Sequence, residues 1–214
     1  MTETIKRERL RLVIATGNRN KVREIQDKFS AIEGLTLVPL SDFPDPPEVI
    51  EDGATFLENA MKKAGGIAAF TGLPSMADDS GLVVDALGGR PGVLSARYGG
   101  PSADDADRNR MILEEMRGIP AERRAARFVC VIAVVFLDGT TFSAEGICEG
   151  VIAETMRGSH GFGYDPIFFL PDRGKAMAEL PLDEKNRISH RARALEKMRE
   201  ILIAADLNPP ELKK

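Results

Sequence analysis

A hairpin signal near the middle of the chain constrains the fold most. Phe128–Leu137 is the longest β-branched run, Asp138-Gly139 is a typical tight-turn pair, and Thr140–Ala153 returns as a partner strand. Two strands joined by so short a turn pair antiparallel. Any fold of this chain is therefore built around that pair.

The flanking segments alternate between strand-like and helix-like patterns. Leu10–Thr16 and Leu35–Leu40 are short apolar runs typical of buried strands. These patterns predict an α/β domain with a mixed sheet that can bend into two lobes. Further strands are expected over Leu82–Leu87 and Ile167–Leu170, and helices over Val22–Ile32 (ending at Gly34), about Ala54–Phe70, from Ser102 to Met116, and over Leu195–Leu202.

Charge and hydropathy exclude several classes of protein. The 29 basic and 33 acidic residues give a net charge of -4, which argues against a nucleic-acid partner and an anionic membrane partner. No apolar run reaches the roughly 20 residues that span a bilayer. Residues 1–9 are polar and lack the apolar centre of a secretion signal, so we expect a cytoplasmic protein. We assign 1–9 as an extension, 10–206 as a single domain and 207–214 as a tail.

Both cysteines, Cys130 and Cys148, lie in apolar stretches. Buried free thiols in a reducing compartment are the expected state, and a disulfide between paired strands is the alternative.

An acidic motif, Met76–Gly81, follows small and apolar residues at what reads as a strand-to-turn junction. Carboxylates so close to a core usually persist because a cation lies between them, most often Mg²⁺ bridging to a phosphate. In an extended strand Asp78 and Asp79 point to opposite faces, so only one can address a given cleft. Glu51, just before a predicted helix, is either part of a helix cap with Asp52 or a further metal ligand.

The segment Thr16–Lys21 joins a predicted strand to a predicted helix. Asn18 is a sound N-cap, which places Lys21 in the first helical turn, where its charge opposes the helix dipole. A phosphate bound at the exposed amides would reverse that penalty. An ordinary solvated lysine is the alternative, and the spacing is not that of a P-loop.

Two later segments carry binding candidates. In Gly161–Pro166, Phe162 or Tyr164 can stack on a base and Asp165 can accept a hydrogen bond from its edge; aromatic side chains tucked into the core are the alternative. The second segment lies around the start of the last helix. A solvated helix face explains Arg187 and Arg193 better than it explains His190 and Arg191. His160 is expected to be an ordinary loop residue. The cationic or imidazole groups of this second segment are Lys185, Arg187, His190, Arg191 and Arg193.

Six motifs in order carry a resemblance to a known family. Together they resemble the inosine triphosphate pyrophosphatase family of non-canonical purine nucleoside triphosphate pyrophosphatases, over Leu12 to Leu202. The motifs are Thr16-Gly17-Asn18-x-x-Lys21, Phe56-Leu57-Glu58-Asn59-Ala60, Asp78-Asp79-Ser80-Gly81-Leu82, Pro91-Gly92-Val93-x-Ser95-Ala96-Arg97-Tyr98, Gly161–Phe168 and Ser189-His190-Arg191.

The resemblance implies a fold and a reaction. The fold would be an elongated, two-lobed α/β domain with a mixed twisted sheet, flanking helices and a central cleft, usually a homodimer. The reaction would be Mg²⁺-dependent hydrolysis of ITP, dITP and XTP to the monophosphate and pyrophosphate.

The resemblance also implies residue roles. Glu51 and Asp79 would hold the metal, with Asp79 also the base for the attacking water. Thr16, Gly17, Asn18, Arg19, Asn20 and Lys21 would cradle the phosphates, with Lys185 adding charge, and Ser80, Phe162, Gly163, Tyr164, Asp165, His190 and Arg191 would line the nucleoside pocket.

Base choice follows from hydrogen-bond donors. Arg191 and His190 aimed at O6 suit hypoxanthine or xanthine and reject adenine, whose own N6 donors would face them. Guanine shares O6, so its rejection requires crowding or an unpaired 2-amino group. The alternatives are a related pyrophosphatase for modified pyrimidine or methylated nucleotides and a nucleotide sensor without turnover.

Overall fold

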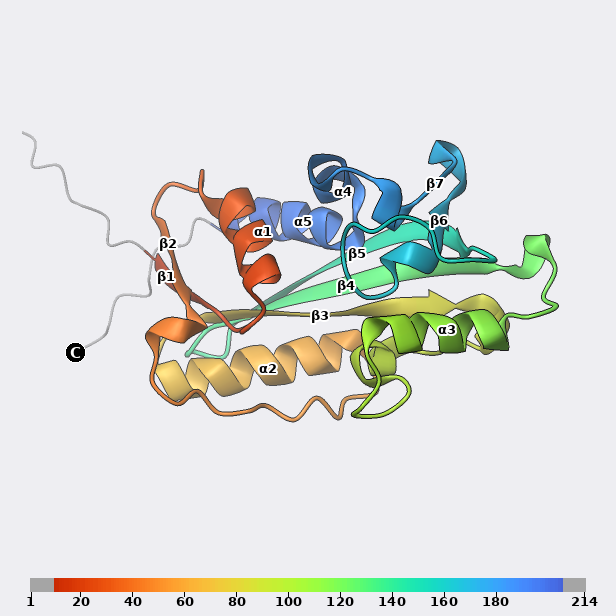
Figure 1. The fold of residues 1–214 in the computed structure, drawn as a ribbon. Helices are drawn as coiled ribbons and strands as arrows, with labels where there is room; N and C mark the ends of the chain where they lie inside the picture. Colours follow the sequence, from red (N-terminus) through yellow and green to blue (C-terminus); the bar gives the residue numbers. More distant parts are fainter. Residues whose placement is uncertain (1–9, 206–214) are drawn as a thin grey trace, which may run out of the picture.

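The structure, a computed structural model, describes residues 10–205, apart from the side chain of Asn20. The predicted extension 1–9 and tail 207–214, with residue 206, lie outside the described residues. A seven-stranded mixed sheet forms the centre of an elongated α/β fold (Figure 1). Its order is β2 (Leu35–Pro39), β1 (Leu10–Ile14), β3 (Ser75–Val84), β4 (Ala125–Val135), β5 (Thr141–Ile152), β6 (Phe168–Leu170) and β7 (Lys175–Ala176).

The predicted hairpin is confirmed as the β4–β5 pair. Its strands are antiparallel in register from Val135 opposite Thr141 to Ala125 opposite Val151. The turn closes when the Thr140 amide donates to the Asp138 carboxylate at 2.8 Å. β2, β1 and β3 run parallel to one another, and every later neighbour is antiparallel, so the sheet is mixed as expected.

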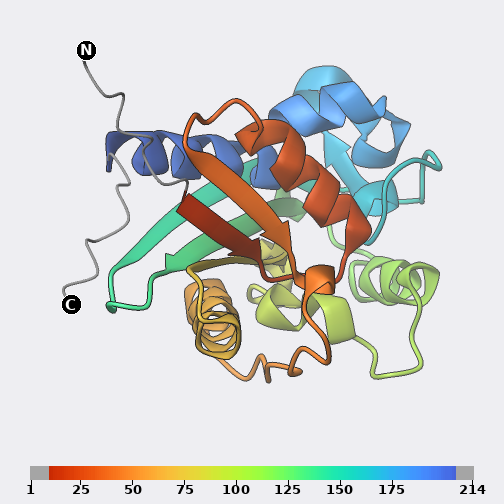
Figure 2. The same cartoon turned by 90° about the vertical axis from the view of Figure 1, so that its left-hand side faces the viewer.

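Helices cover both faces of the sheet. α2 packs against β3 and β4 on one face, and α5 packs against β4 and β5 on the other, with α1 beside it (Figures 1 and 2). α4, which the periodicity does not predict, is only two turns long. The helices are α1 (Arg19–Phe29), α2 (Phe56–Thr71), α3 (Asp105–Glu115), α4 (Leu182–Ile188) and α5 (His190–Ala204).

The acidic motif lies inside a strand rather than at its end. β3 is continuous from Ser75 to Val84, so the expected separate strand Leu82–Leu87 is wrong, and Asp85–Leu87 forms a 3₁₀ turn. The strand tolerates Asp78 and Asp79 in its middle because side chains from the covering helices pair with both.

One expected helix cap is wrong, and one of the two alternatives for Glu51 and Asp52 is excluded. Asp104 rather than Ser102 caps α3, because Asp104 and Asp107 exchange hydrogen bonds with each other's amides in a capping box. Thr55 rather than Glu51 or Asp52 caps α2, and its hydroxyl accepts from the Glu58 amide at 3.1 Å.

The position of the motif on β3 follows from two hydrophobic cores. Met76 belongs to a core shared with α1 and α5, whereas Leu82 and Val84 belong to a second core shared with α3. Asp78 and Ser80 lie between them on the same strand face. The polar residues Asp78 and Ser80 therefore lie at the boundary between these two cores, and the expected division into two lobes stays a prediction.

Cys130 and Cys148 are buried free thiols, as expected. Within residues 10–205, no helix combines the length and hydrophobicity needed to cross a membrane.

Candidate active site

The Thr16–Lys21 segment forms the turn between β1 and α1, next to the middle of β3. The Asn18 amide donates to the Thr16 hydroxyl at 3.2 Å, and the Lys21 amide donates to the Asn18 side chain at 3.3 Å. Asn18 is thus the predicted N-cap. Gly17 and Arg19 are exposed, and the side chain of Asn20 lies outside what the structure describes.

The side chain of Lys21 is not an ordinary solvated lysine. Its ammonium lies 2.8 Å from Asp78 Oδ2, and Asp78 is only 2% exposed. Although burial opposes ionisation of Asp78, Lys21 and Arg191 hold its pKa well below the usual range. A positive charge is therefore fixed beside the first turn of α1, at a helix N-terminus, which by itself also favours an anion.

Asp79 points to the opposite face, toward α2. Its Oδ2 accepts from the side-chain amide of Asn59 at 3.0 Å, and its Oδ1 accepts from the backbone amide of Ser80 at 2.9 Å. Burial raises the Asp79 pKa, and the charge of Glu51 raises it further, against hydrogen bonding by Asn59 and the charge of Lys63.

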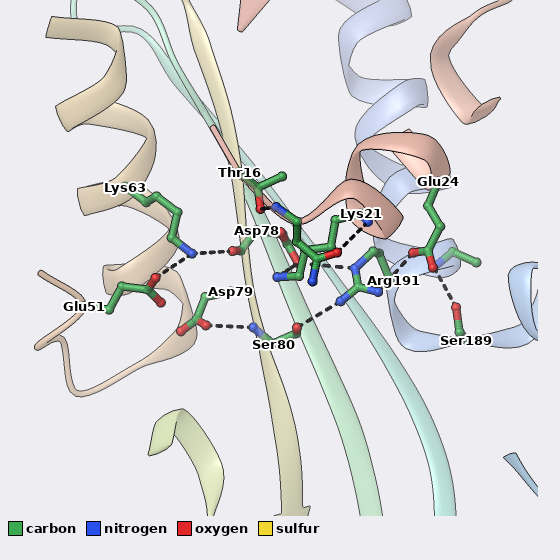
Figure 3. A network of polar contacts seen from close by, with 12 residues as sticks. Thr16, Lys21, Glu24, Glu51, Lys63, Asp78, Asp79, Ser80, Ser189 and Arg191 are labelled. Atoms are coloured by element: carbon green, nitrogen blue, oxygen red, sulfur yellow. Dashed lines mark hydrogen bonds and ion pairs between the residues drawn. The ribbon is translucent and has the colours of Figure 1, made fainter. Parts of the chain in front are cut away.

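Glu51 lies beside Asp79, as predicted (Figure 3). The Lys63 ammonium lies 2.9 Å from Glu51 Oε1 and donates to the Asp78 carbonyl at 3.0 Å. The Arg97 guanidinium donates to the Glu51 carbonyl at 2.6 Å. Lys63 therefore links the Glu51 carboxylate to β3, and Arg97 holds the Glu51 backbone.

The sequence reasoning missed Lys63 and Asn59 as site residues. Both lie on α2, and Asn59 sits in one of the six motifs without having been given a role. Their signal was positional, since they are four residues apart and share one helix face. That face contacts β3.

The donor set of Glu51 and Asp79 fits Mg²⁺. Among residues 10–205 no three His, Cys, Asp or Glu side chains converge as a metal cage. Mg²⁺ typically uses one or two carboxylates and completes its shell with water and substrate phosphate oxygens. Burial and, to a smaller extent, the charge of Glu51 raise the Asp79 pKa, and a bound cation would favour the ionised carboxylate against both.

Arg191, in the first turn of α5, lies at the centre of a polar network on the other face of β3 (Figure 3). It donates from Nε to Asp78 at 3.3 Å, from Nη1 to Glu24 at 3.0 Å and from Nη2 to the Ser80 hydroxyl at 3.3 Å. Burial disfavours its charged form, but the Asp78 and Glu24 carboxylates raise its pKa overall.

His190 begins α5, as predicted, and is buried. Its ring stacks on Phe128 with centroids 4.8 Å apart, and burial followed by the charges of Arg191 and Lys185 holds its pKa well below 6.5. Its Nδ1 has no hydrogen-bond partner among the described residues. The helix approaches β5 so closely here that a Cβ at Gly146 would lie 2.1 Å from the His190 carbonyl oxygen.

The two stacking candidates in Gly161–Pro166, the aromatic loop, differ in their exposure. The Phe162 ring is 38% exposed, with the Lys185 ammonium 4.5 Å and the Arg191 guanidinium carbon 5.7 Å from its centroid. Tyr164 is buried in the second core and donates its hydroxyl to the Ser95 carbonyl at 2.9 Å. Stacking by Tyr164 is therefore wrong, and Phe162 is the available ring.

Asp165 closes this loop rather than presenting a free acceptor. Its Oδ2 accepts from Lys185 at 2.5 Å and from the Phe162 amide at 2.9 Å. Burial raises the Asp165 pKa, and the charge of Lys185 opposes that rise. Gly161 has φ of +81°, and a Cβ there would lie 2.0 Å from the Asp165 carboxylate. The predicted contact of Lys185 with phosphate stays a prediction.

The site thus combines three chemical capacities. Two neighbouring carboxylates suit a divalent cation, and a lysine beside a helix N-terminus suits phosphate. A partly exposed Phe162 ring beside the Arg191 guanidinium suits a nucleobase. Such a combination suits a nucleoside polyphosphate with its metal ion.

Comparisons with known proteins agree with this combination. The sequence profile of the Ham1 family matches residues 12–201. The chain is 53% identical to a dITP/XTP pyrophosphatase of Geobacter sulfurreducens over 90% of this chain and 96% of that protein. It is 52% identical to a dITP/XTP pyrophosphatase of Thermus thermophilus over 94% of each. The structure of a HAM1 protein from Coxiella burnetii superposes with a TM-score of 0.86 at 42% identity, covering 91% of this chain and 99% of that one.

Proposed function

The chain belongs to the Ham1 family, and from this premise we propose that it hydrolyses ITP, dITP and XTP to the monophosphate and pyrophosphate with Mg²⁺. The observation that carries the proposal is the convergence of Glu51, Asp79 and Lys21 with Arg191 around the middle of β3. The printed names of the relatives support the substrate class. Support for Mg²⁺ comes from the donor set described above.

The phosphate side of the site stabilises the leaving group. Cleavage between the α and β phosphates develops negative charge on pyrophosphate. Lys21 and the amides of the first turn of α1 supply positive potential there before the reaction begins. A bound Mg²⁺, held by Glu51 and Asp79, would neutralise further phosphate charge.

Asp79 is the base in this proposal. Asn59 and the Ser80 amide each bind one of its oxygens, so the carboxylate keeps one orientation. A fixed carboxylate can orient a water molecule and accept its proton. The opposite lone pairs of both oxygens remain for water and metal.

The base side of the site favours a 6-oxo purine. Arg191 uses three of its five N–H groups on protein acceptors, which leaves two for substrate. His190 is neutral, so one ring nitrogen carries a proton and can donate. Adenine would set its N6 donors against these donors and leave buried groups unpaired. Phe162 offers the ring on which the base stacks.

A nucleotide panel with separate detection of pyrophosphate and orthophosphate tests the proposal. With Mg²⁺ we expect pyrophosphate from ITP, dITP and XTP, and kcat/KM for ATP lower by at least 100-fold. Orthophosphate as the product would contradict the reaction. A preference for pyrimidine or methylated nucleotides would contradict the base-reading argument, and tight ITP binding without product would indicate a sensor.

Matched acidic variants test the carboxylate roles. Asp79→Asn should keep the fold, seen by circular dichroism, and lose about 10³-fold or more in kcat. Glu51→Gln should lose activity that added Mg²⁺ partly restores. Asp52→Asn is the control, because Asp52 is exposed and pairs with Lys62. Equal activity of Asp79→Asn and Asp52→Asn would remove Asp79 from the mechanism.

We further propose a cytoplasmic homodimer, as the resemblance implies. Large apolar side chains are exposed on the segments around Glu51, and the proposed dimer interface would include them. They are Ile50, Leu57 and Leu94. Sedimentation of the full chain tests this, and a monomer at micromolar concentration would contradict it.

A further inference from the structure

Asp78 has no role in the mechanism proposed above, although it is more buried than Asp79, at 2% against 8% exposed. A single oxygen, Oδ2, lies 2.8 Å from the Lys21 ammonium and 3.3 Å from Arg191 Nε. Lys21 belongs to the phosphate side of the site and Arg191 to the base side. One carboxylate oxygen is therefore the shared contact of both halves (Figure 3).

The environment of Asp78 argues against a metal ligand. Side chains alternate along β3, so Asp78 faces α1 and α5 while Asp79 faces α2 and Asn59. A metal cation at Asp78 Oδ2 would lie beside two positive side chains already there. Its other oxygen, Oδ1, is buried without a hydrogen-bond partner, and among residues 10–205 Asp78 belongs to no group of three His, Cys, Asp or Glu side chains that could hold a metal.

The charges of this network balance without substrate. Lys21 and Arg191 face Asp78, and Glu24 from α1 pairs with Arg191 from the other side at 3.0 Å. Lys63 approaches from α2 but bonds the Asp78 carbonyl rather than its carboxylate. A buried cation that loses its counter-ion is strongly destabilised, so the positions of Lys21 and Arg191 depend on each other through Asp78.

We propose that Asp78 is a positioning residue that couples the phosphate-binding Lys21 to the base-reading Arg191 and binds no metal. The inference rests on the proposed function, which assigns Lys21 and Arg191 to opposite ends of the nucleotide. A change at Lys21 leaves Asp78 with Arg191 alone and shifts the guanidinium. Binding of the base at Arg191 then changes in response to a substitution at Lys21, although Lys21 does not contact the base.

A measurement of metal binding distinguishes a positioning role of Asp78 from a role as a metal ligand. Mn²⁺ binding to the full chain without nucleotide can be followed by the paramagnetic resonance of the free ion. Asp78→Asn should bind Mn²⁺ within twofold of the parent, whereas Asp79→Asn should bind at least tenfold more weakly. A tenfold loss in Asp78→Asn would make Asp78 a ligand and overturn the proposal.

Coupling is tested with ligands that occupy one half of the site each, inosine for the base side and pyrophosphate for the phosphate side. Lys21→Met should weaken pyrophosphate binding and also weaken inosine binding by at least threefold. In an Asp78→Asn background, Lys21→Met should change inosine binding by less than 1.5-fold. Unchanged inosine binding in Lys21→Met alone would overturn the coupling.

Glu24→Gln is the matched control, because it removes a carboxylate from Arg191 without removing the link to Lys21. In that background Lys21→Met should still weaken inosine binding; loss of the effect there would overturn the assignment of coupling to Asp78. If Asp78→Asn alone does not fold, the Lys21→Met, Asp78→Asn double variant removes the unpaired cation and carries the Mn²⁺ test. These binding assays need no turnover, so a parent that releases no pyrophosphate would contradict the proposed function and leave this test intact.

Discussion

Asn59 acts on both sides of the proposed metal site through one buried amide. Its nitrogen donates to Asp79 at 3.0 Å, and its oxygen accepts from the Gly53 amide at 2.7 Å, two residues after Glu51. The fit is tight, because a Cβ at Gly53 would lie 2.7 Å from the same amide oxygen. Asn59 therefore fixes the distance between the strand that carries Asp79 and the loop that carries Glu51.

We predict that Asn59→Ala weakens metal binding and activity by about 10- to 100-fold, the usual effect of losing a partner that orients a metal ligand. Titration of Mn²⁺ and the Mg²⁺ dependence of kcat measure the two effects. Lys62→Gln, on the exposed side of α2, is the control. Parent-like Mn²⁺ affinity in Asn59→Ala would show that the carboxylates hold their places without the amide.

At the residue scale, the sequence motifs predicted which polar residues gather but not how they pair. Lys21, Arg191 and both aspartates carry local signals, such as an unfavourable charge in a first helical turn. The side of β3 that each aspartate faces depends on strand register and on which helix covers each face. The partners Glu24 and Lys63 come from long-range packing, which no local pattern encodes.

At the scale of elements, α3 holds the aromatic loop in place from across the second core. Asp105 accepts from the Gly163 amide at 2.7 Å, and Asn109, which is buried, donates to the Gly163 carbonyl at 2.7 Å. The position of Phe162 is thus set partly by a helix that the sequence reasoning gave no functional role.

We predict that Asn109→Ala raises KM for ITP by about tenfold or less and lowers the preference for ITP over ATP, since one hydrogen bond contributes about 1 kcal/mol. Inhibition by pyrophosphate should not change, because Lys21 lies on the other half of the site. Arg110→Gln is a control on the exposed side of α3. Weaker inhibition by pyrophosphate in Asn109→Ala would mean that the loop also shapes the phosphate side.

Element prediction succeeded where periodicity was long and failed where tertiary contacts decided the ends. The β4–β5 hairpin, α1 and α5 follow from apolar spacing and turn residues. β3 was cut short because two adjacent carboxylates look like a strand end until α1, α2 and α5 supply their partners. α4 escaped detection because two turns hold too few apolar positions to show a period.

At the scale of the whole molecule, the Asp78 side of the site lies where two of the four hydrophobic clusters of residues 10–205 meet. One core joins β1, α1 and α5, and the other joins α3, β6 and the far ends of β3 and β4. Between them β3 carries Asp78 and Ser80 instead of apolar side chains. The boundary between cores therefore gives up burial of apolar surface, and the proposed ligand would supply contacts to both sides.

Ligand binding should consequently stabilise the whole fold and not only the site. We predict that inosine monophosphate with Mg²⁺ at about 100 times its dissociation constant raises the free energy of unfolding by about 2.7 kcal/mol. For a domain of this size that is a rise in Tm of about 5–10 °C. Adenosine monophosphate at the same concentration should give a rise under about 2 °C, because Arg191 and His190 select for O6. Scanning calorimetry of the parent with each nucleotide measures both. An equal rise with the two nucleotides would place base selection in the transition state alone, and no rise with either would mean that the two cores unfold without involving the site between them.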